Sequence, residues 1–218
     1  MQIKICGITN SQDALACAAA GVDMIGLNFS PQSLRRISPA IATEIVAAIR
    51  PRFGQTKVVG VFVDQELEFV RKVTKDLALD AIQLHGEETP RYLSKLDVPF
   101  LIKALRIGRY SAFAAADYKC DAILLDTWST KSPGGTGEVF PWSVAAALQP
   151  HVNRLILAGG LTSKNVADAI RMVRPFAVDV CSDVEDGPGR KDHLKVRRFI
   201  AVVRALEEEK VSSEKASL

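Results

Sequence analysis

Two side chains suited to proton transfer stand at the ends of short apolar runs. Cys6 closes the β-branched run Ile3–Cys6, and Asp126 follows the apolar run Ile123–Leu125. A carboxyl group that such a run delivers to a partly desolvated place keeps a raised pKa, which suits a general acid for an oxygen leaving group. The alternatives are simpler, since Asp126 can cap the next turn and a free cysteine is usually a small buried apolar group.

Two adjacent arginines offer a site for an organic anion. Arg35 and Arg36 lie in a polar loop, residues 30–36, and a guanidinium can grip a carboxylate through two parallel hydrogen bonds. We expect one of the two to face only solvent. Histidine is a common proton-transfer residue, but His85 has no second histidine at ligand spacing, which favours a structural role.

Glycine-containing turns follow two late strands, at Ala158–Leu161 and Ser182–Gly189. In a barrel, the loops after strands 7 and 8 form the usual phosphate cradle, because backbone N–H groups and a helix dipole favour an anion. We therefore expect a phosphorylated substrate, although such turns can also merely reverse the chain. The segment Ser132–Gly137 is predicted to be a mobile loop that covers substrate, with an exposed surface loop as the alternative.

The elements that position these residues alternate between short β-branched runs and helical patterns with apolar residues three and four apart. Eight such units predict an α/β protein, a single-domain (β/α)8 TIM barrel over residues 1–206, with a frayed tail at 207–218. An open doubly wound sheet is the alternative, but Cys6–Thr9 lacks its glycine fingerprint. The predicted strands are Ile3–Cys6, Met24–Phe29, Lys57–Val63, Ala81–His85, Phe100–Leu105, Ala122–Asp126, Arg154–Ala158 and Val178–Cys181.

A barrel of this kind builds its active site at the carboxyl ends of its strands. Polar residues gather at those ends, namely Cys6, Asn28, residues 30–36, Asp64, His85, Asp126, Asp179 and Ser182. With Ile3 and Ile5 taken as inward-facing, Cys6 reaches the mouth only if a twist or bulge breaks the alternation of strand 1. The helix starts are marked too, since Ser38 precedes Pro39, and Thr162 or Ser163 follows Gly160.

Composition excludes several classes of protein. Of 218 residues, 48% are hydrophobic and 24% charged, which is typical of a soluble globular chain. The net charge of +3 comes from interleaved basic and acidic residues, so we expect no nucleic-acid partner. Four dispersed cysteines form no metal or redox motif, and neither a signal peptide nor a membrane span is found. We expect a cytoplasmic monomer or homodimer acting on a small phosphorylated substrate.

Several motifs in order resemble the phosphoribosylanthranilate isomerase family, through about Asp192. They are Lys4–Thr9, Phe29–Ser33 with Arg35 and Arg36, Gly60–Val63, Gln83–Glu87, Leu124–Thr127, Gly134–Gly137, Ala158–Leu161 and Asp179–Ser182. The resemblance implies Cys6 as general base, Asp126 as general acid and Arg35 on the anthranilate carboxylate. It also implies a phosphate site around Gly159, Gly160, Ser182 and Asp183, with Asp179 counted in the substrate-binding set.

The implied reaction is an Amadori rearrangement of N-(5-phosphoribosyl)anthranilate that needs no cofactor or metal. The chain departs from the family in the loop after the sixth predicted strand, called loop 6 below. There, Glu138 replaces a common lysine, and Phe140-Pro141-Trp142 lacks the usual aspartate. It departs again at Asp183, where the family usually has glycine, and a carboxylate facing a phosphate dianion is unfavourable. Asp183 can instead hold its turn and point into water.

The alternatives are related barrels. The histidine-pathway isomerase has an aspartate where Cys6 stands, and indole-glycerol-phosphate synthase needs a catalytic lysine set that has no match here. The alternative outside the enzymes is a barrel that binds a phosphosugar but has lost catalysis. Retention of Cys6, Arg35 and Asp126 together argues against it, because a binding protein needs neither a base nor an acid.

Overall fold

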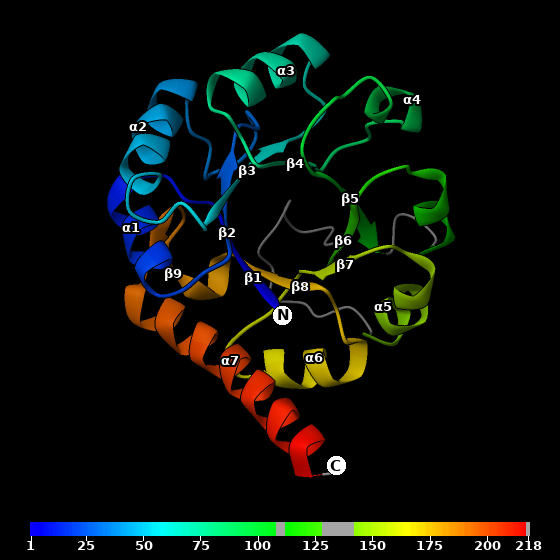
Figure 1. The fold of residues 1–218 in the computed structure, drawn as a ribbon. Coiled ribbons are helices and arrows are strands. Elements are labelled where there is room, and N and C mark those ends of the chain that lie inside the picture. Colours follow the sequence, from blue (N-terminus) through cyan, green and yellow to red (C-terminus); the bar gives the residue numbers. More distant parts are fainter. Residues whose placement is uncertain (108–111, 128–141, 217–218) are drawn as a thin grey trace.

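Eight parallel strands pair in chain order and close into a barrel, because β8 returns to pair with β1 (Figure 1). This computed structural model describes residues 1–107, 112–127 and 142–216. The barrel confirms the α/β (β/α)8 architecture. Its strands are β1 Gln2–Cys6, β2 Met24–Asn28, β3 Lys57–Phe62, β4 Ala81–Leu84, β5 Leu101–Ile107, β6 Ala122–Thr127, β7 Leu155–Leu157 and β8 Ala177–Val180.

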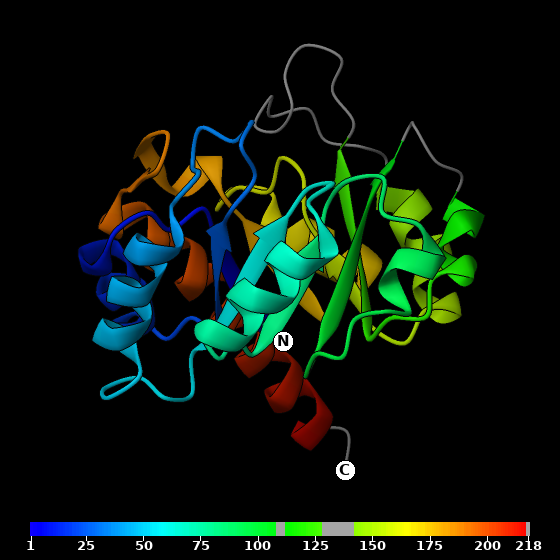
Figure 2. The same cartoon turned by 90° about the horizontal axis from the view of Figure 1, so that it is seen from above.

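Helices surround the barrel as an outer layer, and the side view shows them along the strands (Figure 2). The predicted start of α2 is confirmed, since the Ser38 hydroxyl accepts a hydrogen bond from the Ile41 N–H and Pro39 follows it. The α-helices are α1 Ser11–Ala19, α2 Pro39–Ile49, α3 Leu67–Asp76, α4 Pro90–Leu93, α5 Trp142–Leu148, α6 Val166–Val173 and α7 His193–Ala216. Shorter elements are the 3-10 helices η1 Ala112–Asp117, η2 Gln149–His151 and η3 Ser182–Val184, and the strands β9 Glu185–Gly187 and β10 Arg190–Lys191.

Side chains alternate between two apolar layers along each strand, as the two-residue period requires. Ile3 and Ile5 belong to the layer between strands and helices, whereas Met24 belongs to the layer inside the barrel. Lys4 is the register partner of Met24, so Lys4 and Cys6 share the inner face. The expectation that Ile3 and Ile5 point inward was therefore wrong, and Cys6 reaches the mouth without a bulge.

The last helix continues into the segment expected to fray. Helix α7 extends to Ala216, because the stretch after residue 206 contains several Glu and Lys residues, which favour helix. Arg204 donates from Nη1 to Glu207 at 2.9 Å, and the amino group of Met1 pairs with the same carboxylate. These contacts fasten the start of the predicted tail to the barrel, and residues 217–218 lie outside the described part.

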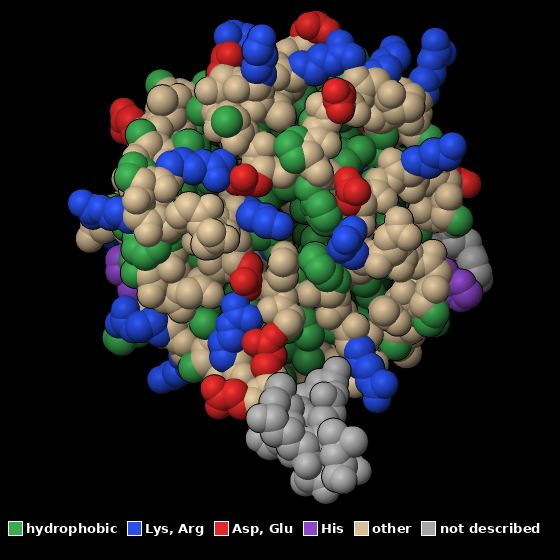
Figure 3. Space-filling view, in the orientation of Figure 1, with side chains coloured by type: hydrophobic (Ala, Val, Ile, Leu, Met, Phe, Trp, Pro, Cys, Tyr) green, Lys and Arg blue, Asp and Glu red, His purple; other side chains and the backbone are tan. Residues whose placement is uncertain are grey.

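The face that carries the amino ends of the strands is closed and mixed in charge. Figure 3 shows acidic and basic side chains interspersed over it, without a large patch of one sign. The Arg154 guanidinium lies 5.6 Å from the ring centre of Phe100 and 5.4 Å from that of Phe176, which covers this end of the barrel. In the described part of the chain, no helix has the length and apolar character needed to cross a membrane.

Candidate active site

Cys6 ends β1 inside the barrel mouth and is partly exposed. Its register partner on β2 is Gly26. A Cβ atom at Gly26 would lie 2.8 Å from Cys6 Sγ and 3.2 Å from Lys4 Nζ, too close for any other residue. Because Gly26 has no side chain, the Cys6 thiol and the Lys4 ammonium both lie in the space next to its Cα atom.

Three neighbours hold Cys6 in its charged form. A hydrogen bond from the Cys181 thiol lowers the pKa of Cys6 most, and the positive charges of Lys4 and Lys191 lower it further. Burial acts in the opposite direction but is outweighed, so the pKa of Cys6 lies well below its ordinary value. A thiolate is the reactive form of cysteine, and this one faces the mouth.

A buried ion pair lies beneath the thiolate. Lys4 Nζ donates to Asp179 Oδ2 at 2.8 Å, from residues that are directly opposite each other on β1 and β8. Burial disfavours the ammonium, but Asp179 and Cys6 outweigh it, so the pKa of Lys4 lies above its ordinary value. Asp179, expected in the substrate-binding set, is 8% exposed and contacts Lys4 in the barrel interior.

Asp126 lies near the carboxyl end of β6 and faces His85. Its Oδ2 is 3.3 Å from His85 Nε2, and both side chains are partly exposed. Gln83 Nε2 lies 2.9 Å from His85 Nδ1. If the amide nitrogen donates there, the ring hydrogen is on Nε2 and points at the carboxylate. His85, which sequence interpretation left structural, therefore contacts the candidate acid.

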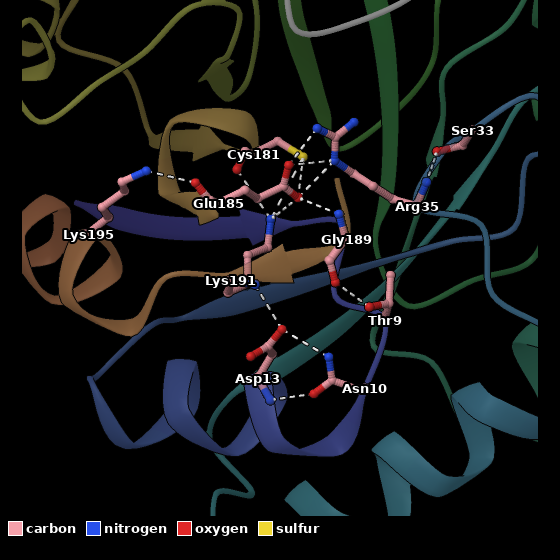
Figure 4. A network of polar contacts seen from close by, with 10 residues as sticks. All are labelled: Thr9, Asn10, Asp13, Ser33, Arg35, Cys181, Glu185, Gly189, Lys191 and Lys195. Carbon is pink, nitrogen blue, oxygen red and sulfur yellow. Dashed lines mark hydrogen bonds and ion pairs between the residues drawn. The ribbon is translucent and has the colours of Figure 1, made fainter. Parts of the chain in front are cut away.

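Arg35 is held by a carboxylate from the other end of the chain (Figure 4). Its Nε lies 2.8 Å from Glu185 Oε1 and its Nη2 lies 2.6 Å from Glu185 Oε2. The hydrogen bond to Glu185 is the main reason why the pKa of Arg35 is raised, and Arg35 stays charged. Arg36 is exposed, as expected for one member of the pair.

Glu185 and Lys191 are polar residues of the mouth that sequence reasoning missed. Glu185 is 7% exposed, accepts from Lys191 Nζ at 2.8 Å and also accepts from the Gly189 N–H at 3.2 Å. Lys191 Nζ also lies 3.9 Å from Cys181 Sγ. The three residues Arg35, Glu185 and Lys191 therefore link the loop after β2 to the loop after β8 at the side of Cys6.

The glycine turns after β7 and β8 lie next to each other at the same rim. Gly159 and Gly160 have φ values of 82° and 66°, which L side chains rarely adopt. Ser182 is exposed at the start of η3, and Asp183 Oδ2 accepts a hydrogen bond of 3.3 Å from the Ser163 N–H. A side chain of one turn thus bonds to a backbone amide of the other.

Two predicted features of loop 6 cannot be compared with the structure. The glycine-rich segment Ser132–Gly137 and the departures at Glu138, Phe140 and Pro141 lie outside the described residues. Within the described ranges, no group of three or more His, Cys, Asp or Glu side chains is arranged to hold a metal ion.

The sequence matches the family model of N-(5'-phosphoribosyl)anthranilate (PRA) isomerase over residues 3–202. The chain belongs to this family. An N-(5'-phosphoribosyl)anthranilate isomerase of Geobacter sp. (strain M21) is 48% identical over 206 residues, which cover 94% of this chain and 98% of that protein. As a member of the PRA isomerase family, the chain is an isomerase of tryptophan biosynthesis.

Solved PRA isomerases share the barrel. The structure of the enzyme from Thermotoga maritima has a TM-score of 0.85 at 39% identity and covers 94% of this chain and 99% of its own. A second, in complex with reduced 1-(o-carboxyphenylamino)-1-deoxyribulose 5-phosphate, has a TM-score of 0.81 at 38% identity, with the same coverage of both chains.

Asp183 stands at the position where the resemblance to the PRA isomerase family implies glycine. Its carboxylate turns toward the loop after β7 and bonds to Ser163, so it does not simply point into water. The hydrogen bond occupies a backbone N–H at the rim where the two glycine turns meet. This carboxylate is therefore placed to compete with any anion that the two loops bind.

Proposed function

We propose that this PRA isomerase family member catalyses the Amadori rearrangement of N-(5-phosphoribosyl)anthranilate to 1-(2-carboxyphenylamino)-1-deoxyribulose 5-phosphate, with Cys6 as base and Asp126 as acid. The observation that carries the proposal is a cysteine stabilised as thiolate at the same barrel mouth as a partly exposed carboxyl group. We place the reaction in the cytoplasm. A second member of the family binds the reduced form of this product.

The first step would open the ribose ring. Asp126 gives its proton to the ring oxygen while the C1–O bond breaks, and the anthranilate nitrogen supplies electrons to form a protonated Schiff base. His85, 3.3 Å from Asp126, would orient the carboxyl group and stabilise the carboxylate left behind. The developing negative charge thus stays next to a hydrogen-bond donor.

The second step would remove the proton from C2. The Schiff base acidifies this C–H bond, so the Cys6 thiolate suffices as base, and the electron pair moves to the nitrogen to give an enolamine. The enolamine then tautomerises to the ketone. Asp126 has then lost one proton and Cys6 has gained one, so exchange of protons with solvent returns both residues to their starting forms without a cofactor.

Charged groups around the mouth would hold the two ends of the substrate. Among the described residues, Arg35 Nη1 has no hydrogen-bond partner, so it can receive the anthranilate carboxylate while Nε and Nη2 stay on Glu185. The backbone around Gly159, Gly160 and Ser182–Asp183 would bind the phosphate. Asp179 would serve substrate only indirectly, by holding Lys4 beneath Cys6.

The test of the proposal is a fluorescence assay that follows the loss of phosphoribosylanthranilate generated in place. We expect this protein to consume it at a rate proportional to enzyme concentration, with no added metal or cofactor. Substrate that disappears no faster than in the protein-free control would reject the proposal and favour another phosphosugar isomerase or a barrel that only binds.

Arg35→Ala is expected to lower kcat/KM more than Arg36→Ala does. Loss of a charge-assisted contact to a desolvated carboxylate costs roughly 1.5–3 kcal/mol, or about 10- to 150-fold in kcat/KM. Arg36 is exposed and serves as the matched control. Steady-state kinetics of both variants check the assignment, and equal losses would show that Arg35 does not bind the carboxylate.

Asp183→Gly is expected to tighten phosphate binding. A carboxylate about 6 Å from a dianion costs on the order of 1–3 kcal/mol, and its removal also frees the Ser163 N–H. The gain should shrink as salt rises, because ions screen an accessible repulsion. Titration of inorganic phosphate at low and high salt measures the effect.

Two controls separate charge from backbone effects at this turn. Asp183→Asn keeps an acceptor for Ser163 and removes only the charge, so it should also tighten binding at low salt. Asp186→Asn removes a charge from an exposed side chain of the same loop and should change little. Affinity that is unchanged in both Asp183 variants at low salt would end the repulsion hypothesis.

A further inference from the structure

Two cysteines lie side by side at the barrel mouth, at the ends of neighbouring strands. Ile5 on β1 and Val180 on β8 are register partners; Cys6 is the last residue of β1, and Cys181 directly follows β8. Adjacent parallel strands are about 4.8 Å apart, within the Cα separation of about 4.4–6.8 Å that a disulfide requires. Each of the two groups also shifts the pKa of the other, that of Cys6 downward and that of Cys181 upward, as expected of neighbouring thiols.

We propose that Cys6 and Cys181 are a redox modification site, which a peroxide converts to a reversible disulfide. Both residues are partly exposed at the mouth, so a small oxidant reaches them. The effect on turnover rests on the proposed function, because only a catalytic Cys6 would make oxidation inhibitory. The bond itself does not depend on that role.

Cys6 is the sulfur that reacts first. Its thiolate attacks one oxygen of hydrogen peroxide, an S–O bond forms, the O–O bond breaks, and hydroxide leaves and takes a proton to become water. Lys4 and Lys191 favour the thiolate that this step needs. The product is a neutral sulfenic acid on Cys6.

Cys181 then resolves the sulfenic acid. The charged Cys6 is the first reason why the pKa of Cys181 is raised and burial is the second, whereas Lys191 and Arg35 act in the opposite direction. Once Cys6 is neutral, its charge no longer raises the pKa of Cys181, while Lys191 Nζ remains 3.9 Å from Cys181 Sγ. Cys181 attacks, the S–S bond forms, the S–O bond breaks, and a second water leaves with the proton of Cys181. Overall, two thiols lose two electrons and one peroxide becomes two waters.

The other two cysteines offer an internal comparison. Cys17 is fully buried on α1, and burial raises its pKa to about 12. Burial also raises the pKa of Cys120, whose thiol contacts the backbone oxygens of Tyr118 and Ala122. Neither has the thiolate character that reaction with peroxide requires, so oxidation should be confined to the mouth.

The first experiment maps the bond in the wild-type protein without using activity. Protein treated with a small excess of hydrogen peroxide is alkylated, digested without reductant and analysed by mass spectrometry. We expect a linked peptide pair that contains Cys6 and Cys181 and separates on reduction. Cys6 that carries only added oxygen, with no link to Cys181, would overturn the inference.

The second experiment compares recovery in variants, each measured against its own untreated rate. After peroxide and then dithiothreitol, wild type and the control Cys120→Ser should regain most of their turnover. Cys181→Ser cannot form the bond, so its Cys6 proceeds to irreversible sulfinic acid and should regain less than about half. Equal recovery in Cys181→Ser and wild type would count against the disulfide.

The two readouts keep this inference separate from the proposed function. A linked peptide in a protein whose reduced form has no isomerase activity would reject the proposed function and support the modification site. An active protein that loses turnover without a linked peptide would keep the function and reject the modification site.

Discussion

Cys6→Ser is expected to abolish the isomerisation while the barrel stays folded. A serine hydroxyl is far too weak a base for the C–H bond at C2, and a general base contributes about 10²- to 10⁴-fold to the rate. Stability should change little, because Lys4 keeps its ion pair with Asp179 at 2.8 Å when the thiolate is lost. Steady-state kinetics and the thermal unfolding midpoint measure the two effects.

The control for this variant is Cys120→Ser, which changes a thiol outside the mouth and should leave turnover intact. The pH profile adds an independent test. Cys6 acts in its deprotonated form, so its lowered pKa should move the acidic fall of kcat/KM to a pH well below the ordinary pKa of a thiol. A variant with a tenth of wild-type turnover, or a wild-type fall starting near pH 9, would remove Cys6 as the thiolate base.

Asp126→Asn is expected to reduce kcat by about 10²- to 10⁴-fold, the contribution of a general acid. An amide has no acidic proton to give to the ring oxygen, but it keeps an oxygen that can accept from His85 Nε2 across the 3.3 Å contact. The site should therefore keep its geometry, and KM should change much less than kcat. Single-turnover kinetics with substrate generated in place measure the loss in the chemical step.

Two comparisons identify the proton donor. Asp168→Asn removes a carboxylate from an exposed position on α6 and should have no effect. A general acid acts while protonated, so the loss of rate at high pH in the wild type should be absent from the residual activity of Asp126→Asn. If Asp126→Asn keeps full turnover while His85→Gln loses it, the donor is His85 and the assignment is wrong.

The fold was predictable because its signal is local. Each strand is a short β-branched run between helical patterns, and all eight predicted strands overlap the observed ones. Which face of a strand points inward was not predictable in the same way, since Ile3 and Ile5 suit either apolar layer. Only the closed barrel shows that the inner layer at β1 accepts Lys4, through its pair with Asp179.

The site was only partly predictable, because its electrostatics depend on partners far away in the chain. Cys6, Asp126 and Arg35 stand out by type and position after their strands, and the structure brings them to one mouth. The carboxylate that holds Arg35 is Glu185, 150 positions later, and nothing local indicates that pairing. The contact between His85 and Asp126 is hidden for the same reason, since β5 lies between their strands.

The pairing of β1 with β8, which closes the barrel, also determines when the protein can become active during its synthesis. Cys6 and Arg35 leave the ribosome well before Cys181, Glu185 and Lys191, which set their charge and position; Glu185 follows Arg35 by 150 residues. Contacts between such distant residues form late, because a long stretch of chain must first be ordered. A nascent chain that ends before β8 therefore holds the proposed base and the arginine without the groups that prepare them, and substrate should be turned over only after the residues through Lys191 have left the ribosome.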